Sequence, residues 1–127
     1  MIVRSLFVLF SLFITLGSAN AHGPERGPNG GQVQDLADNH VELVMQGHEI
    51  VVYLFDAQNA PIAAEGVVAT ATLLARGAQP ETVSLQPAGA NVLRGRGRLV
   101  EQPGLKVVVS LTLPGQRPQI GRYALIE

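Results

Sequence analysis

Residues 40–55, with the sequence HVELVMQGHEIVVYLF, decide the fold. Aliphatic residues recur at every second position on both sides of Gly47-His48, which is the spacing of two half-buried strands. A glycine in the first central position is typical of the type II′ turn that joins two hairpin strands. This turn predicts one aliphatic face made of the pairs Met45 with Ile50, Leu43 with Val52 and Val41 with Leu54.

The other face of the same hairpin carries its polar and aromatic residues. The expected pairs are His40 with Phe55, Glu42 with Tyr53 and Val44 with Val51. Because side chains alternate along a strand, His40 and Glu42 point the same way. His48 lies at the tip of the hairpin, on the order of 20 Å from His40. These two histidines therefore cannot bind one metal ion.

Outward from this hairpin, runs rich in Val, Leu, Ile and Thr alternate with turn residues at intervals of roughly 8–12 residues, which is typical of an all-β chain. No stretch keeps a helical apolar period, so we expect no substantial helix. The spacing predicts an immunoglobulin-like antiparallel β-sandwich of seven or eight strands, with a small closed barrel as the alternative. The expected strands are residues 32–36, 40–46, 49–56, 67–74, 81–86, 91–99, 105–113 and 119–126.

The first 21 residues have the three parts of a signal peptide. A short segment with Arg4 precedes an apolar run, residues 6–16, and the small-x-small triplet Ala19-Asn20-Ala21 follows it. The apolar run is shorter than the roughly 20 residues needed to cross a bilayer as a helix. We therefore expect cleavage after Ala21, a periplasmic protein without a membrane span, a Gly/Pro-rich flexible arm at 22–31 and a β-sandwich domain at 32–127.

Composition limits the possible functions of the mature chain. Cleavage after Ala21 leaves 106 of the 127 residues and removes Arg4, so eight Lys and Arg face ten Asp and Glu. The resulting formal charge of −2 gives no reason to expect nucleic acid as a partner. The absence of cysteine excludes disulfides and thiolate sites. No nucleophile elbow, phosphate loop or His-Glu-x-x-His motif is present, so we do not expect an enzyme.

The expected cleavage site makes His22 the first residue of the mature chain. A first-position histidine offers two nitrogens, its α-amine and its imidazole, which can close a chelate ring on a metal ion. The chain runs out and back between Gly31 and His40, so the arm and His40 are expected at one end of the domain. We predict a metal site made of His22 and His40, completed by Glu42 or water. Such nitrogen-rich sets suit Cu(II), and Zn(II) uses the same ligands.

A second feature is the alternation of Arg94, Arg96 and Arg98 with two glycines. In a strand, the three guanidinium groups would line one face. Such a stripe can receive an anionic partner, while the simpler interpretation is a solvated outer face.

The chain also resembles small exported proteins and domains associated with bacterial heavy-metal efflux. In the periplasmic adaptor subunits of such pumps, a similar His-Gly-Gly element precedes a strand with a polar residue and Glu-Leu. The matching segments here are residues 22–24, 27–33, 39–44, 69–72 and 106–115. The resemblance implies metal handling in the periplasm, with His22 and His40 at the matching positions and a component of an efflux pump as a partner.

Two functions follow from these patterns. The first is a periplasmic metal-binding protein, for copper or zinc, that serves as a buffer, a carrier or an accessory to heavy-metal efflux. The alternative is a non-catalytic structural or interaction module of a cell-envelope complex, in which the histidines have no metal role.

Overall fold

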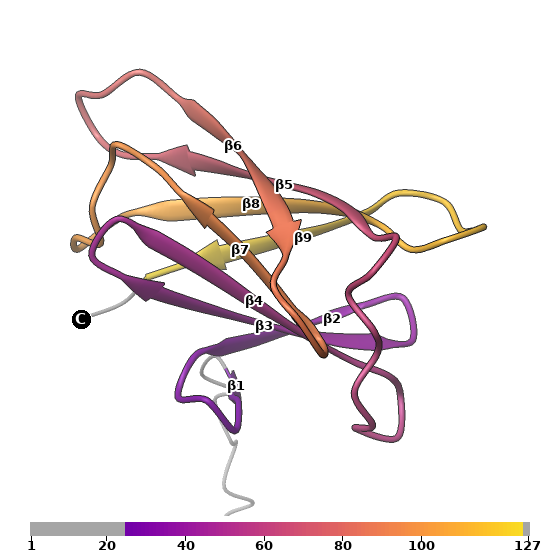
Figure 1. The fold of residues 1–127 in the computed structure, drawn as a ribbon. Coiled ribbons are helices and arrows are strands. Elements are labelled where there is room, and N and C mark those ends of the chain that lie inside the picture. Colours follow the sequence, from indigo (N-terminus) through magenta and orange to yellow (C-terminus); the bar gives the residue numbers. More distant parts are fainter. Residues whose placement is uncertain (1–24, 126–127) are drawn as a thin grey trace, which may run out of the picture.

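The computed structural model describes residues 25–125, and within this range the chain is all-β, as predicted (Figure 1). The expected signal peptide and His22 lie outside the described residues. None of the described residues forms a helix long and apolar enough to cross a membrane. The strands are β1 (Glu25–Arg26), β2 (Gln32–Leu36), β3 (Asn39–Gln46), β4 (Glu49–Phe55), β5 (Val68–Leu74), β6 (Glu81–Pro87), β7 (Val92–Arg96), β8 (Lys106–Thr112) and β9 (Gln119–Ala124).

The β3–β4 hairpin has the register predicted from its sequence. All of the expected cross-strand pairs are present, from Met45 with Ile50 at the turn to His40 with Phe55 at the far end. Gly47 has a φ of 59°, the sign that the first central residue of a type II′ turn requires. The hairpin therefore presents one aliphatic face to the core and leaves His40 and Glu42 on the other face.

The nine strands form one sheet in the order β1-β2-β3-β4-β7-β6-β5-β8-β9, and all neighbours are antiparallel. The β5–β6–β7 meander lies between β4 and β8, so the chain crosses over in the long connections 56–67 and 97–105. Both β4-β7-β6-β5 and β7-β6-β5-β8 are Greek-key orders. The sheet curls into a half-barrel, and the immunoglobulin-like sandwich stays a prediction.

Strand β6 is where the sheet bends most clearly. It pairs with β5 through residues 81–85 but with β7 only through Gln86 and Pro87. As a result, β5, β6, β8 and β9 lie over β2, β3, β4 and β7 (Figure 1). The inward side chains of both groups form the core, whose largest fully buried members include Tyr123, Leu43, Ile50, Leu54, Leu73, Leu93, Leu105 and Leu111.

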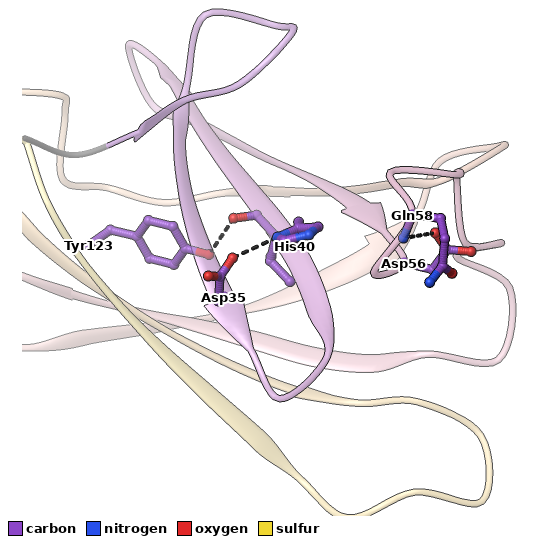
Figure 2. Close-up of polar contacts among 6 residues, drawn as sticks. Asp35, His40, Asp56, Gln58 and Tyr123 are labelled. Atoms are coloured by element: carbon purple, nitrogen blue, oxygen red, sulfur yellow. Dashed lines mark hydrogen bonds and ion pairs between the residues drawn. The ribbon is translucent and has the colours of Figure 1, made fainter. Parts of the chain in front are cut away.

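Two polar contacts tie the last strand to the first strands. The Tyr123 hydroxyl crosses the core from β9 and donates to the backbone oxygen of Val41 at 2.8 Å (Figure 2). Burial raises the pKa of this hydroxyl above its ordinary value. The side-chain amide of Gln32 donates to the Ala124 oxygen and accepts from the Ala124 nitrogen, both at 3.1 Å. Gln32 therefore bridges β2 and β9 with the donor and acceptor pattern of a peptide group.

Two segments differ from the sequence prediction by more than one or two residues at a strand end. The strand expected over 91–99 ends at Arg96. The Gly97 nitrogen still donates at 3.0 Å to the oxygen of His48, the residue opposite it in the register with β4, but the Arg98 nitrogen donates to the Glu81 carboxylate and not to a backbone oxygen of β6. The arm, expected to lack regular structure, contains strand β1, which pairs with β2 through Glu25 and Arg26.

Candidate functional site

His40 lies at the start of β3 with its imidazole directed at a carboxylate. Its Nδ1 is 2.6 Å from Oδ1 of Asp35, which is the cross-strand partner of His40 on β2 (Figure 2). An ionised carboxylate can only accept hydrogen bonds, so Nδ1 of His40 is the donor. In a neutral imidazole, Nε2 then keeps a free lone pair. The histidine side chain is 29% exposed, so the ring is partly open to solvent. This geometry leaves one nitrogen of a well-oriented imidazole available to a ligand.

Sequence reasoning missed Asp35. The expected strands 32–36 and 40–46 leave a three-residue connection at 37–39, whereas the turn residues are Ala37 and Asp38, and Ala37 takes a φ of 53°. A two-residue turn at Ala37-Asp38 would have placed Asp35 opposite His40. The signal was weak because alanine is an unusual residue in the left-handed region.

Glu42, the third predicted ligand, is fully buried. One carboxylate oxygen, Oε2, accepts from the backbone nitrogens of Asn29 at 3.0 Å and Gly31 at 2.8 Å. The other, Oε1, accepts from Asn29 Nδ2 at 2.9 Å and lies 3.3 Å from the Asn29 nitrogen. A buried carboxylate is stable only when its oxygens are well supplied with donors, and here a single loop supplies them.

The remaining histidines are not placed together with His40. His48 lies in the β3–β4 turn, at the other end of the ladder from His40. His22 lies outside the described residues. Within residues 25–125, no three His, Asp or Glu side chains are grouped so that they could hold a metal ion.

The three arginines of the predicted stripe are all exposed. Arg94 Nη1 donates to Glu49 Oε1 at 2.6 Å, and Arg98 Nε lies 3.8 Å from Glu81 Oε2. Two of the three guanidinium groups thus have a carboxylate nearby, which reduces the positive potential that an anionic partner would meet.

Gly95, which separates Arg94 from Arg96, faces β6. A Cβ at Gly95 would lie 2.9 Å from the Ser84 oxygen and 2.8 Å from a Leu85 methyl carbon. The glycine is needed because the neighbouring strand approaches too closely for a side chain.

A shallow cleft of about 390 Å³ opens beside the junction of β2 and β9. Its walls include Glu25, Arg26, Gln32, Met45 and Glu101, and neither Asp35 nor His40 contributes to it. The candidate site is therefore on the open outer surface of the sheet and not in this cleft.

No family model, no curated protein and no solved structure matches this chain.

Proposed function

We propose that this chain is a periplasmic metal-binding protein that holds Cu(II) or Zn(II) between His22, at the start of the mature chain, and His40. It acts as a buffer, a carrier or an accessory to heavy-metal efflux. The observation that supports this function best is the hydrogen bond between Asp35 and His40. Metal-binding histidines almost always donate their second ring nitrogen to a carboxylate or carbonyl, which fixes the tautomer and the ring orientation.

The course of β1 supports a role for His22. Glu25 pairs with Val33 on β2, and Val33 lies two residues before Asp35. Glu25 is two strands away from β3 and lies level with Glu42, which is two residues along β3 from His40. Two strand spacings and the rise of two residues together give a distance of about 12 Å between Glu25 and His40. His22 is three residue steps before Glu25, and these steps cover at most about 10 Å. The length of the arm is thus compatible with one metal ion between His22 and His40.

The proposed ligands are the α-amine and imidazole of His22 and Nε2 of His40. We assign the remaining position to water and not to Glu42, because both Glu42 oxygens already accept hydrogen bonds from the loop. Three nitrogen ligands with an open position suit Cu(II) in tetragonal geometry, and they also suit tetrahedral Zn(II).

The test is a titration of the mature protein, isolated from the periplasm after its first residue has been established by mass. We expect Cu(II) and Zn(II) to saturate at one equivalent. His40→Ala removes a ligand and should weaken binding strongly, whereas His48→Ala is the matched control and should leave binding unchanged. A form with one extra residue before His22 should lose tight binding, because the amine is displaced from its chelate position. Equal binding by all of these forms would contradict the proposal.

The alternative function is a non-catalytic interaction module of the cell envelope. The exposed aliphatic side chains of Val68 and Ile120 favour it, with 70% and 57% of their surfaces accessible. They lie on the outer face of the sheet, on β5 and β9, which flank β8. If the mature protein, with His22 as its first residue, binds neither Cu(II) nor Zn(II), the interaction module explains the structure better than the metal-binding function does.

A further inference from the structure

Asn29 is the one asparagine of the chain that a glycine follows. Asparagine is a thermolabile residue, and a following glycine makes it reactive, because a backbone without a Cβ can approach the asparagine side chain closely. The pair lies in the loop 27–31 between β1 and β2, where Asn29 is exposed and Gly30 has a φ of 79°. A Cβ at Gly30 would have no described atom within 4 Å, so no other described part of the chain covers that side of the residue.

The reaction open to this pair is the spontaneous deamidation of Asn29. The Gly30 backbone nitrogen loses its proton to the solvent and attacks Cγ of Asn29. The new N–C bond closes a succinimide ring, while the bond from Cγ to Nδ2 breaks and the amide leaves as ammonia with a proton from the solvent. Water then adds to one of the two ring carbonyls and opens the ring. The product is aspartate or isoaspartate, and in isoaspartate the main chain is one atom longer.

Both reacting groups are held in the closed loop. Nδ2 of Asn29 donates to Oε1 of the buried Glu42 at 2.9 Å, and the Gly30 nitrogen donates to the Gly27 oxygen at 3.0 Å. The attack requires that the Asn29 side chain turns away from Glu42 and that the Gly30 nitrogen leaves its turn. Deamidation therefore proceeds from an opened form of the loop, and its rate follows the equilibrium between the closed and opened forms.

The products do not fit the closed loop. In aspartate, a carboxylate oxygen replaces the Nδ2 donor that contacts Glu42 at 2.9 Å, and two ionised carboxylates repel each other strongly at such a distance. In isoaspartate, the extra main-chain atom lies just before Gly31. The Gly31 nitrogen donates to Glu42 Oε2 at 2.8 Å, and a Cβ at Gly31 would overlap the Leu43 oxygen, so the loop has no slack there. Both products therefore favour release of the loop from β3.

We propose that Asn29 is a modification site: its deamidation detaches the loop 27–31 from β3, and Glu42 slows the reaction as long as the loop is closed. Because the ammonia is lost to the solvent, the change runs in one direction. The loop is then attached in newly made molecules and detached in aged ones. Every residue involved lies within 25–125, and the site is independent of metal binding.

The first experiment incubates the purified protein at mildly alkaline pH and follows each asparagine by peptide mass mapping. Asn91 is the internal control, because its Nδ2 also donates to a backbone oxygen, that of Leu54 at 3.0 Å, but a β-branched valine follows it. The variants are Glu42→Gln, which replaces the acceptor of Nδ2, and Gly30→Ala, which obstructs the attacking nitrogen. Glu49→Gln is the matched control on the same hairpin, since Glu49 pairs with the exposed Arg94.

We expect Asn29 to deamidate faster than Asn91 in the unaltered protein. Glu42→Gln should raise the rate at Asn29 about tenfold, because a hydrogen bond to a charged acceptor shifts the opening equilibrium by at least about that factor. Gly30→Ala should slow the reaction, and Glu49→Gln should leave it unchanged. Protein unfolded in urea should deamidate at Asn29 faster than the folded protein, which tests the protection without any substitution.

The second experiment measures the consequence for the loop. Asn29→Asp carries one of the products, and Asn29→Ala is its control, because it removes the same donor without adding a charge. Amide hydrogen exchange at Gly31, whose nitrogen donates to Glu42, reports the attachment. We expect exchange to be faster in Asn29→Asp than in Asn29→Ala, and faster in the aged, deamidated protein than in the fresh protein.

Three results would overturn this proposal. A rate at Asn29 no higher than that at Asn91, in folded and unfolded protein alike, would show that Asn29 is not a modification site. Equal rates at Asn29 in folded and urea-unfolded protein, or in Glu42→Gln and the unaltered protein, would show that Glu42 and the closed loop give no protection. Gly31 exchange that is as slow in Asn29→Asp and the aged protein as in the fresh protein would show that deamidation does not detach the loop. If Glu42→Gln does not fold, the comparison with urea still decides whether the loop protects Asn29.

Discussion

Glu42 and Glu81 are two glutamates that each hold a loop from another part of the chain. Glu42 accepts from the backbone nitrogens of Asn29 and Gly31, and Glu81, at the start of β6, accepts from those of Arg98 at 2.8 and 2.9 Å and Leu99 at 3.1 Å. Their surroundings differ: Glu42 is fully buried, whereas the Glu81 side chain is 20% exposed. The hydrogen bonds to Glu42 are therefore shielded from water, whereas those to Glu81 are partly exposed to it.

This difference determines what each acid contributes to stability. When a buried acceptor is removed, its donors stay buried without a hydrogen-bond partner, and their desolvation lowers the free energy of unfolding. When an acceptor at the surface is removed, water can replace it. We therefore expect Glu42 to be the more important of the two for the free energy of unfolding, although both accept a similar number of backbone hydrogen bonds.

The largest expected effect is that of Glu42→Ala. This change leaves the amides of Asn29 and Gly31 without their acceptor and opens a space under the loop. We expect a loss of about 3 kcal/mol in the free energy of unfolding. Urea denaturation measures it, with Glu49→Ala as a control that should cost less than about 1 kcal/mol. Equal costs at Glu42 and Glu49 would show that the bonds to the loop add nothing to stability.

The second prediction compares the glycines beside the two acids. A Cβ at Gly97 would lie 2.7 Å from Glu81 Oε1 and 2.9 Å from a Leu73 methyl carbon, both of which are ends of flexible side chains. A Cβ at Gly27 would overlap the carboxylate carbon of Glu42, which the loop holds in place. We expect Gly27→Ala to cost about 2–3 kcal/mol and Gly97→Ala about 1 kcal/mol. Thermal unfolding of the two variants checks this order, and a larger cost at Gly97 would contradict it.

The sequence predicted the β3–β4 hairpin and its register, because the turn at Gly47-His48 and the alternation of aliphatic residues both imply the same cross-strand pairs. It also predicted that His40 and Glu42 share a face. It did not predict the β1–β2 loop, because the contacts of Asn29 with Glu42 span 13 residues and leave no periodic pattern. A buried glutamate between Val41 and Leu43 looks like an ordinary outward-facing polar residue until the loop that covers it is known.

The candidate site was predictable only in part. His40 was found because histidines are few, and its partner Asp35 was missed because the turn between β2 and β3 uses an alanine with a positive φ. Arg98 was placed in a strand because the Arg-Gly alternation continues through it. In the structure, the backbone nitrogen of Arg98 bonds to the Glu81 carboxylate and leaves the ladder at that point.

The smallest expected effect is a pH dependence at Glu81. The pKa of its carboxyl is lowered, first by the hydrogen bond from the Arg98 nitrogen and then by that from Leu99. A carboxyl whose pKa is lower in the folded protein stabilises the fold above its unfolded pKa, near 4.5, and loses this contribution as the pH falls through the folded value. Glu81→Gln lacks this contribution at every pH. We therefore expect the variant to be slightly less stable than the unaltered protein at about pH 6, and the difference to shrink toward about pH 3. Urea midpoints at the two pH values measure it. A difference that stays constant would mean that the charge of Glu81 does not contribute, and that the Arg98 and Leu99 nitrogens are held equally well by a neutral acceptor.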